Sequence, residues 1–333
     1  MKNWRLWIGI LVSVLCLYLS ARGIQFRSLL EAFRQVQVEW ILLALGLLVL
    51  VDLARARRWR LLLQPLAKPR VGRLFFLLNI GYLVSNFSPM RMGELLRAFL
   101  CARLERIGVA SALSTIAVER LVDALVVALL LLALVPFVAL PPELLRPAVG
   151  VGLLAAALFV VLAAVVSRRR NSLQRYEQAA QAFPFLRREA LRRTVVAALD
   201  GFATLGSWPQ ALRLGAWTLI IWLAGALDFS LLLRSMGLRL PASAGLLLIC
   251  VTSLGMVVPS SPGYVGVFEY LTVVSLSVYG VSREVALGSA LVLHAALYLK
   301  SLVLGLIGLW MEGYSYTRLR ETLARAQTEP MAT

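Results

Sequence analysis

The sequence predicts an all-α integral membrane protein with about six transmembrane helices and two re-entrant helical hairpins, arranged as an inverted repeat. Of the 333 residues, 60% are hydrophobic and only 15% are charged. Several apolar runs approach the ~20 residues that a helix needs to cross the ~30 Å hydrocarbon core of a bilayer. Two further apolar stretches are interrupted near their middle by proline. Because no polar stretch is long enough for a separate soluble domain, we expect one domain over residues 1–333.

Six segments have the length and composition of full crossings. They are residues 4–19, 38–53, 109–135, 149–166, 212–233 and 285–311. The first follows a basic start, as the apolar core of a signal peptide would. Its apolar run is longer than a usual signal core and Ala21-Arg22 is a poor cleavage site, so we expect it to be retained as a transmembrane helix.

Two stretches, 71–103 and 242–279, are interrupted in the middle. The first is broken at Ser88-Pro89 and the second within residues 259–263. Proline removes a backbone donor and disfavours helix at the residue before it, and halves of roughly fifteen residues are short of the ~20 needed to span. Re-entrant hairpins are the simplest interpretation, since non-helical backbone at membrane depth must be surrounded by protein or water. Two pairs of full-length helices with polar elbows are the alternative.

The distribution of positive charge predicts the orientation. The net charge of +17 is concentrated in three blocks, at residues 55–73, 168–193 and 318–325. Because Lys and Arg accumulate on the cytoplasmic side, we expect both termini, a connector over 168–208 and a basic tail over 316–333 to lie in the cytoplasm, at the cell inner membrane. The predicted outer loop at 22–37 departs from this charge pattern, because it carries three arginines. We expect the arginines of 55–60 to face lipid head groups beside Trp59, and no nucleic-acid partner.

The two interrupted stretches resemble each other. In each, a Ser-Pro pair is followed by glycine four residues after the proline: Ser88-Pro89 with Gly93, and Ser261-Pro262 with Gly266. Each half of the chain then has two crossings, one hairpin and a third crossing, and an odd number of crossings places the second half upside down. We expect repeat 1 at about residues 1–140 and repeat 2 at about 145–315, with broken helices that meet at the midplane as in secondary transporters.

Ionisable residues in the first half form one candidate site. On two successive helices, helical spacing brings together two sets: Arg91, Glu94 and Arg97, then Glu119, Arg120 and Asp123. Charges at membrane depth are costly unless they pair or line a polar cavity. One interpretation is a salt-bridge network that fixes the hairpin against the crossing. The other is a head-group site, in which the arginines hold a phosphate and the acids orient them.

The second break supplies part of an opposite wall. A short helix begins there, and its N-terminus, with Ser261 and Gly263, would favour an anion. Capping of that helix is an equally good account of the serine. Glu269 lies two turns further on and needs a partner, for which we expect an arginine.

The last crossing carries two more candidates. His294, the single histidine, lies midway along it, either as a hydrogen-bonded packing residue or as a proton relay. Lys300 lies on a different face and could neutralise a phosphate or a carboxylate. Asp52 and Asp228 are placed near crossing ends, and we expect both to be structural.

Sequence motifs of enzymes are absent. There is no phosphate-binding loop of NTPases, no dinucleotide fingerprint and no cluster of metal ligands. Cys16, Cys101 and Cys250 are isolated and make neither a metal pair nor a disulfide framework. We therefore expect no catalytic residue, no cofactor and no metal ion.

Three motifs in order resemble the signatures of the lysylphosphatidylglycerol synthase transmembrane region, a family of flippase-like integral membrane proteins. They are Pro89-Met-Arg91-Met-Gly93-Glu94-Leu-Leu-Arg97, Glu119-Arg120-Leu-Val-Asp123 and Pro262-Gly263-Tyr-Val-Gly266-Val-Phe-Glu269. The resemblance covers nearly the whole chain. In bifunctional members this region is implicated in moving aminoacylated phospholipid between leaflets, while a separate soluble domain attaches the amino acid. This chain is similar to a stand-alone member without that domain.

Two departures from the family pattern concern the head group. Tyr264 stands where the family usually has glycine, and Lys300 stands near the place of a usual arginine. Because Arg and Lys are not equivalent at a two-pronged phosphate site, the identity of the head group does not transfer with the resemblance.

The residues and the resemblance together predict a transporter that moves an anionic or zwitterionic phospholipid or glycolipid head group between leaflets through a charged midplane cavity. The candidate substrate-binding residues are Arg91, Glu94, Arg97, Glu119, Arg120, Asp123, Ser261, Gly263, Glu269, His294 and Lys300. The alternative is a membrane-embedded enzyme or accessory subunit acting on a lipid-linked sugar or an aminoacyl-phospholipid. A membrane lipid is the expected partner, and a homodimer or a separate lipid-modifying enzyme are further candidates.

Overall fold

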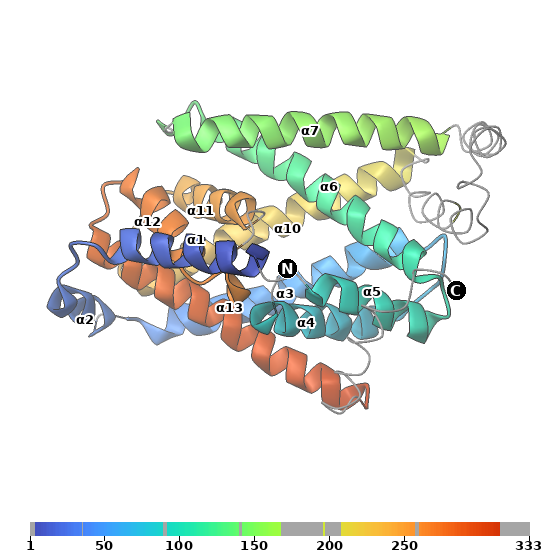
Figure 1. The fold of residues 1–333 in the computed structure, drawn as a ribbon, viewed down its shortest axis with the longest axis horizontal. Helices are drawn as coiled ribbons and strands as arrows, with labels where there is room; N and C mark the ends of the chain where they lie inside the picture. Colours follow the sequence, from blue (N-terminus) through green and yellow to red (C-terminus); the bar gives the residue numbers. More distant parts are fainter. Residues whose placement is uncertain are drawn as a thin grey trace.

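The computed structural model describes residues 4–34, 36–88, 92–139, 142–167, 196, 208–256 and 260–313. Within these ranges the chain is built of helices joined by turns, without strands (Figure 1). The predicted all-α class is confirmed. Of the connector predicted over 168–208, only residues 196 and 208 lie in the described ranges, and the basic tail predicted over 316–333 lies wholly outside them.

Long helices occupy all six segments that were predicted to cross the membrane. They are α1 (Trp4–Ala21), α3 (Val38–Leu63), α6 (Val109–Leu134), α7 (Pro142–Ser167), α10 (Trp208–Ser235) and α13 (Arg283–Met311). Among the described residues, α10 and α13 are each long and apolar enough to cross a membrane, and α3 joins them when it is taken with the short helix before it. The number of crossings remains a prediction.

A short helix, α2 (Phe26–Arg34), lies where the sequence analysis expected only an outer loop. Leu29 of α2 is buried against α13, close to Gly288. On the opposite side of α2, Arg27 and Glu31 form an exposed pair at 3.4 Å. Two turns of amphipathic sequence give too weak a periodic pattern to stand out in a loop of this length.

Helix α3 continues well past the predicted end of its crossing at residue 53. Arg57 and Arg60 are exposed, whereas Arg58 and Trp59 are fully buried. The Nε1 of Trp59 donates to the Thr115 hydroxyl of α6 at 3.1 Å. The expectation that the arginines of this segment all face lipid head groups is therefore wrong, because other helices supply interior partners that the local sequence does not show.

Each interrupted stretch forms two helices that pack against each other. Hairpin 1 consists of α4 (Val71–Phe87) and α5 (Met92–Glu105), and hairpin 2 consists of α11 (Ala242–Gly255), the 3-10 turn η4 (Pro262–Tyr264) and α12 (Val267–Ser277). Hairpin 1 depends on glycine for its close packing, since a Cβ atom on Gly93 would overlap the carbonyl oxygen of Gly81. The predicted breaks in the two apolar stretches are thus present.

The ends of the two hairpins contact each other. Gly263 in η4 has a φ of 70°, in the left-handed region that glycine adopts without strain. A Cβ atom there would lie 3.0 Å from the backbone oxygen of Asn86, at the end of α4, and would overlap the Tyr298 hydroxyl. The helices of hairpin 1 and hairpin 2 lie toward opposite ends of the long axis of the molecule (Figure 1), and the hairpins meet between those ends.

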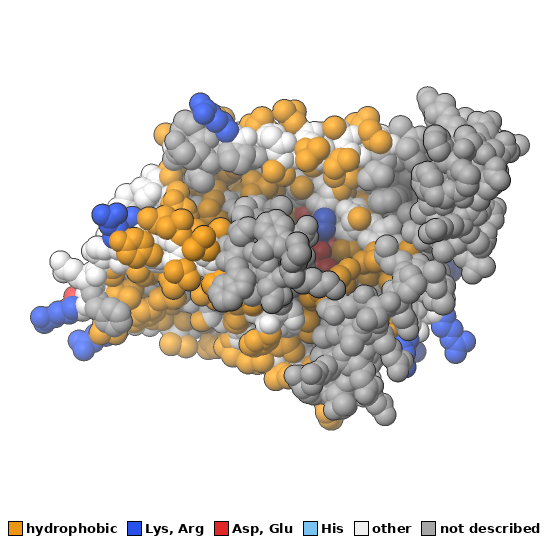
Figure 2. Space-filling view, viewed as in Figure 1, with side chains coloured by type: hydrophobic (Ala, Val, Ile, Leu, Met, Phe, Trp, Pro, Cys, Tyr) orange, Lys and Arg blue, Asp and Glu red, His pale blue; other side chains and the backbone are white. Residues whose placement is uncertain are grey.

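Two apolar cores hold the hairpins in place. One packs around hairpin 1, with Trp59 and Leu100 among its large members, and the other packs around hairpin 2, with Phe229 and Phe268. The face of the molecule in Figure 2 is largely apolar between its ends, and Lys and Arg side chains gather at both ends of the long axis. Near the middle of this face the surface is hollowed, and charged side chains are visible inside.

Replacing Gly93 with alanine is expected to lower the thermal unfolding temperature of the purified protein by several degrees. The added methyl group must separate α4 from α5, and overpacking of this kind costs about 1–3 kcal/mol. Gly46→Ala in α3 is the matched control, because a Cβ atom there meets nothing within 4 Å. Equal unfolding temperatures for the two variants would contradict the close approach of the hairpin 1 helices.

Candidate functional site

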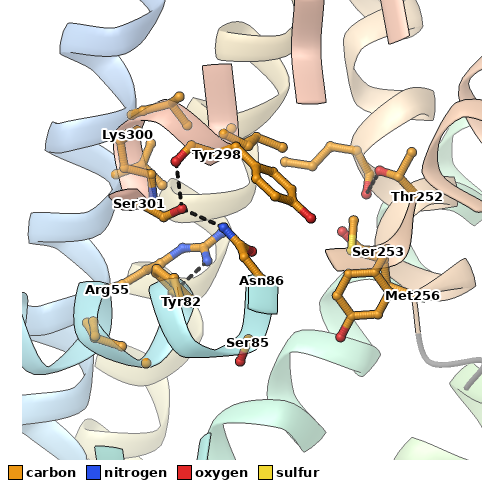
Figure 3. A pocket seen from close by; sticks show the side chains of 18 of the residues that line it. Arg55, Tyr82, Ser85, Asn86, Thr252, Ser253, Met256, Tyr298, Lys300 and Ser301 are labelled. Atoms are coloured by element: carbon orange, nitrogen blue, oxygen red, sulfur yellow. Dashed lines mark hydrogen bonds between the residues drawn. The ribbon is translucent and has the colours of Figure 1, made fainter. Parts of the chain in front are cut away.

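A cavity of about 280 Å³ lies where the ends of the two hairpins meet. Much of its wall is apolar, and its charged or titratable lining consists of Arg55, Tyr82, Glu94, Arg97, Arg120, Asp123, Asp228, Tyr264, His294, Tyr298 and Lys300. Figure 3 shows Arg55, Tyr82 and Lys300 on one side of the cavity, with Thr252 of α11 and Met256, directly after that helix, across from them. The cavity therefore combines an apolar wall with ionisable groups from both halves of the chain.

Glu119 is the centre of a buried ion network that joins α3, α5 and α6. Its Oε1 lies 2.6 Å from Arg120 Nη2, 3.1 Å from Arg97 Nη2 and 3.4 Å from Arg58 Nη2. Arg120 also reaches Glu94, with 3.5 Å between Nε and Oε1. Such mutual contacts compensate part of the cost of removing charges from water.

Arg58, which the sequence analysis placed at the lipid surface, completes this network. Two of its nitrogens contact the two carboxylate oxygens of Asp123, at 2.5 and 3.1 Å, in the two-pronged geometry that this pair of groups favours. Thr218 and Trp222 of α10 bond to the same ion pair, each at 3.0 Å. The one sequence signal for the role of Arg58 is that it follows Arg55 by three residues, which puts both side chains on one face of a helix. That signal is informative only once α3 is known to continue through this segment. Three arginines and three acids then cancel formally.

Arg97 keeps two of its donors free at the cavity. Its side chain is 2% exposed and lines the cavity, and its guanidinium carbon lies 4.9 Å from the centre of the Trp59 ring. Its Nε and Nη1 have no hydrogen-bond partner in the described part of the chain. Leaving such a buried group unpaired costs about 1–3 kcal/mol. Arg97 therefore brings a positive charge with unpaired donors to the wall of the cavity, where an anion would be favoured.

Lys300 and two acids form a second group of charges at the cavity. Lys300 Nζ lies 2.7 Å from Asp52 Oδ2 and 4.8 Å from the centre of the Tyr82 ring. Asp228 of α10 is fully buried, lines the cavity, and has no partner for either carboxylate oxygen among the described residues. The sequence analysis predicted a crossing that ends at residue 53 and therefore placed Asp52 near its end. Because α3 continues to Leu63, Asp52 lies in the middle of the helix instead. Their sequence positions gave no sign that these acids meet Lys300 or the cavity.

Glu269 and His294 form a third group, which holds hairpin 2. Glu269 Oε1 lies 2.5 Å from His294 Nδ1, and its Oε2 accepts the backbone N–H of Gly266 at 2.6 Å. The expected arginine partner is therefore wrong. From the third position of α12 the carboxylate reaches back to cap its own helix, and the arginines are engaged by acids of α5 and α6.

Ser261 is turned away from the cavity. Its hydroxyl donates to the Val265 carbonyl oxygen at 3.0 Å, and its N–H donates to the Ser13 hydroxyl of α1 at 2.9 Å. It stabilises the turn but caps no helix, so the capping that was expected as an alternative is not observed. Tyr264, at the position where the family motif usually has glycine, has a φ of 64°, which explains why glycine suits that position.

Of the predicted site residues, seven line the cavity: Glu94, Arg97, Arg120, Asp123, Gly263, His294 and Lys300. Glu119 and Glu269 lie behind its wall, each bonded to a lining residue. Arg91 lies outside the described residues. In the ranges that the structure describes, no group of three or more His, Cys, Asp or Glu side chains is placed to hold a metal ion.

Comparison with known families gives a match over residues 6–305 to the lysylphosphatidylglycerol synthase TM region. The chain belongs to this family. It is also 27% identical over 119 residues to the UPF0104 membrane protein MJ1595 of Methanocaldococcus jannaschii, a match that covers 35% of this chain and 35% of the relative. No solved structure matches the chain. As a member of the lysylphosphatidylglycerol synthase TM region family with apolar helices, it is a membrane protein of a lipid-related family.

Replacing Arg58 with leucine is expected to destabilise the protein by about 3–5 kcal/mol, because Asp123 then stays buried without its main counter-charge. Unfolding of the purified protein in detergent, followed by circular dichroism, measures the loss. Arg57→Leu is the matched control, since the neighbouring Arg57 is exposed.

The double variant Arg58→Leu with Asp123→Leu should recover much of that stability, since it removes both buried charges together. A double variant as unstable as Arg58→Leu alone would show that altered packing, and not the unpaired charge of Asp123, causes the loss of stability.

Proposed function

We propose that this protein moves the head group of an anionic or zwitterionic phospholipid or glycolipid between the leaflets of a cell membrane. The observation that carries the proposal is the buried Arg97 side chain, which lines the cavity and whose Nε and Nη1 donors have no partner among the described residues. A guanidinium holds a phosphate through charge-assisted hydrogen bonds at fixed geometry. The family is named after the transmembrane region of lysylphosphatidylglycerol synthase, and this name supports a lipid as the substrate.

The cavity suits a head group rather than a whole lipid. Its volume is about 280 Å³, and its lining includes charged side chains from several helices. The hollow in Figure 2 opens on the side of the molecule, between apolar side chains. In the proposed mechanism the head group enters sideways through this hollow, while the acyl chains stay against the apolar surface.

In this proposal, the charged groups at the cavity have two roles: some bind the phosphate and others orient the groups that bind it. Arg97 and Arg120 hold the phosphate, together with Arg91, while Glu119 and Asp123 fix the direction of the guanidinium groups. Arg120 is suited to this role because 35% of its side chain remains exposed. His294 and Lys300 face the head group from the other hairpin and the last helix. No covalent step is required, so the protein is proposed to act as a transporter and not as an enzyme.

Two inverted repeats, at about residues 1–140 and 145–315, account for access from both sides. In this proposal each repeat has two crossings, one re-entrant hairpin and a third crossing. The contact between Gly263 and Asn86 supports it, since hairpins entering from opposite surfaces meet only if each stops partway. Movement of one repeat against the other would expose the cavity to either leaflet in turn. The positive blocks support an orientation in which both termini lie on the cytoplasmic side of the cell inner membrane.

Purified protein in vesicles is expected to speed the exchange of a fluorescent phospholipid between leaflets, measured by quenching the outer leaflet with a membrane-impermeant reductant. Arg97→Gln should slow this exchange by at least about tenfold, because it removes charge-assisted hydrogen bonds worth about 1.5–3 kcal/mol. Arg103→Gln, the same change at an exposed position of α5, should leave the rate unchanged.

Exchange that is insensitive to Arg97→Gln would remove the proposed site. The same vesicles, supplied with an activated sugar or aminoacyl donor, test the alternative: formation of a modified lipid without exchange would favour an enzyme or accessory subunit.

Labelling of single cysteines in intact membranes tests the hairpins, after Cys16, Cys101 and Cys250 are replaced with alanine. Lys68→Cys, before hairpin 1, and Ser282→Cys, after hairpin 2, should react with an impermeant maleimide from opposite sides. Phe87→Cys at the end of α4 should react from neither side, although Phe87 is 67% exposed in the protein. Reaction of Phe87→Cys from the side opposite Lys68→Cys would instead show that hairpin 1 crosses the whole membrane.

A further inference from the structure

His294 is the only histidine of the chain, and both of its ring nitrogens face hydrogen-bond acceptors. Nδ1 lies 2.5 Å from Oε1 of Glu269, and Nε2 lies 3.0 Å from the carbonyl oxygen of Gly263. The ring packs between Phe268 and Tyr298, with 4.7 Å between ring centres on each side. The ring is therefore fixed in an orientation that uses both nitrogens.

These contacts require one more proton than a neutral imidazole and a carboxylate possess. A carbonyl oxygen has no hydrogen to donate, so Nε2 must carry one. The contact between Nδ1 and Glu269 then needs a second hydrogen, since two lone pairs would otherwise face each other. Glu269 also accepts the Gly266 N–H and lies in the first turn of α12, where a negative charge is favoured. The geometry thus places the additional proton on the imidazole ring.

The bound proton holds the end of hairpin 2 in position. Through Nε2 the ring is tied to Gly263 in η4, the segment that lies against Asn86 of hairpin 1. Through Nδ1 it is tied to Glu269, which caps the start of α12. When one proton leaves, a single N–H remains on the ring, so one of the two contacts must be lost. Loss of a proton therefore loosens hairpin 2 at the wall of the cavity.

We propose that Glu269 and His294 form a proton-binding site, and that its occupancy couples proton movement to lipid transport. With the proton bound, η4 is held against α13 and against the end of hairpin 1. With the proton released, η4 is free to move away and the cavity changes shape on this side. The coupling rests on the transport function proposed above, whereas the proton site rests on the contacts of His294 alone.

Other helices that pack against α13 bring few competing groups. The charged or titratable side chains that face it are Asp52 of α3, which is paired with Lys300, Tyr82 of α4, which accepts from Arg55, and Asp228 of α10. The Arg27–Glu31 pair of α2 is exposed, and the described side chains of α1 carry no charge. Asp228 is therefore the second acid at the cavity that could hold the proton, and Asp228→Asn tests this.

A single histidine makes the proton site directly observable. Protein labelled with ¹⁵N-histidine gives one set of ring-nitrogen signals, which report the protonation of Nδ1 and Nε2 over about pH 5 to 9. Both nitrogens are expected to be protonated at the acidic end and one of them to lose its proton as the pH rises. Glu269→Gln should alter this transition, because it removes the carboxylate that faces Nδ1. Thr272→Val, one turn further along α12, removes a buried hydroxyl that has no hydrogen-bond partner among the described residues, and should leave the transition unchanged.

Ring signals that stay in one neutral form across the whole range would overturn the proton site. Asp228→Asn should preserve the transition, and its disappearance in that variant would show that the proton belongs to Asp228 instead.

Lipid exchange in vesicles tests the coupling over the same pH range. A single required proton changes the rate by about tenfold per pH unit beyond the transition, so the exchange rate of the unmodified protein should follow the ring signals. His294→Gln should exchange lipid at a rate independent of pH, while Thr272→Val should follow the unmodified protein. Exchange that is independent of pH while the ring titrates would overturn the coupling and leave transport intact. Absence of exchange at every pH, with a titrating ring, would instead remove the transport function and leave the proton site.

Discussion

Charges enclosed among apolar helices must find a counter-charge, and most of this structure follows from that requirement. The Glu119 carboxylate meets three guanidinium groups from three helices, and the nearby Asp123 is held by Arg58 and by α10. Lys300 and Asp52 tie the last helix to α3 in the same way. All of these contacts except the one between Glu119 and the adjacent Arg120 join different helices, so the ion pairs help to fix which helices are neighbours. Apolar side chains alone would fit several arrangements of such helices.

The places where this requirement is not met are as informative as those where it is. In the described ranges, Arg97 retains unpaired donors and Asp228 retains two unpaired oxygens, although both side chains are buried and both line the cavity. A protein selected only for stability would pair these groups or replace them. Their position at the meeting point of the hairpins is the physical basis for the proposal that a ligand supplies the missing partner.

The architecture was predictable from the sequence to the extent that it depends on local composition. Apolar runs located the six long helices, proline located both breaks, and the spacing of Arg97, Glu119 and Asp123 brought together residues that the structure confirms as one network. The prediction was wrong for side chains whose partners come from other helices or from the fold of their own helix. Arg58 was placed at the surface because its segment is basic, yet its partners come from α6 and α10. The partner of Glu269 was likewise set by the fold of its own helix and by α13, which no spacing rule reveals.

Helix α1 packs on hairpin 2, where the Ser13 hydroxyl accepts the N–H of Ser261, a residue 248 positions later in the chain. A Cβ atom on Gly9 would lie 3.0 Å from the Ser260 carbonyl oxygen, and one on Gly266 would overlap the carbonyl oxygen of Ser13. Helix α1 can therefore make these contacts only after a segment 248 residues further along the chain has been synthesised. Contacts of such long range are slow to form and leave the early segment exposed to wrong associations. Closure of the contact between α1 and hairpin 2 is thus a late step in the folding of this chain.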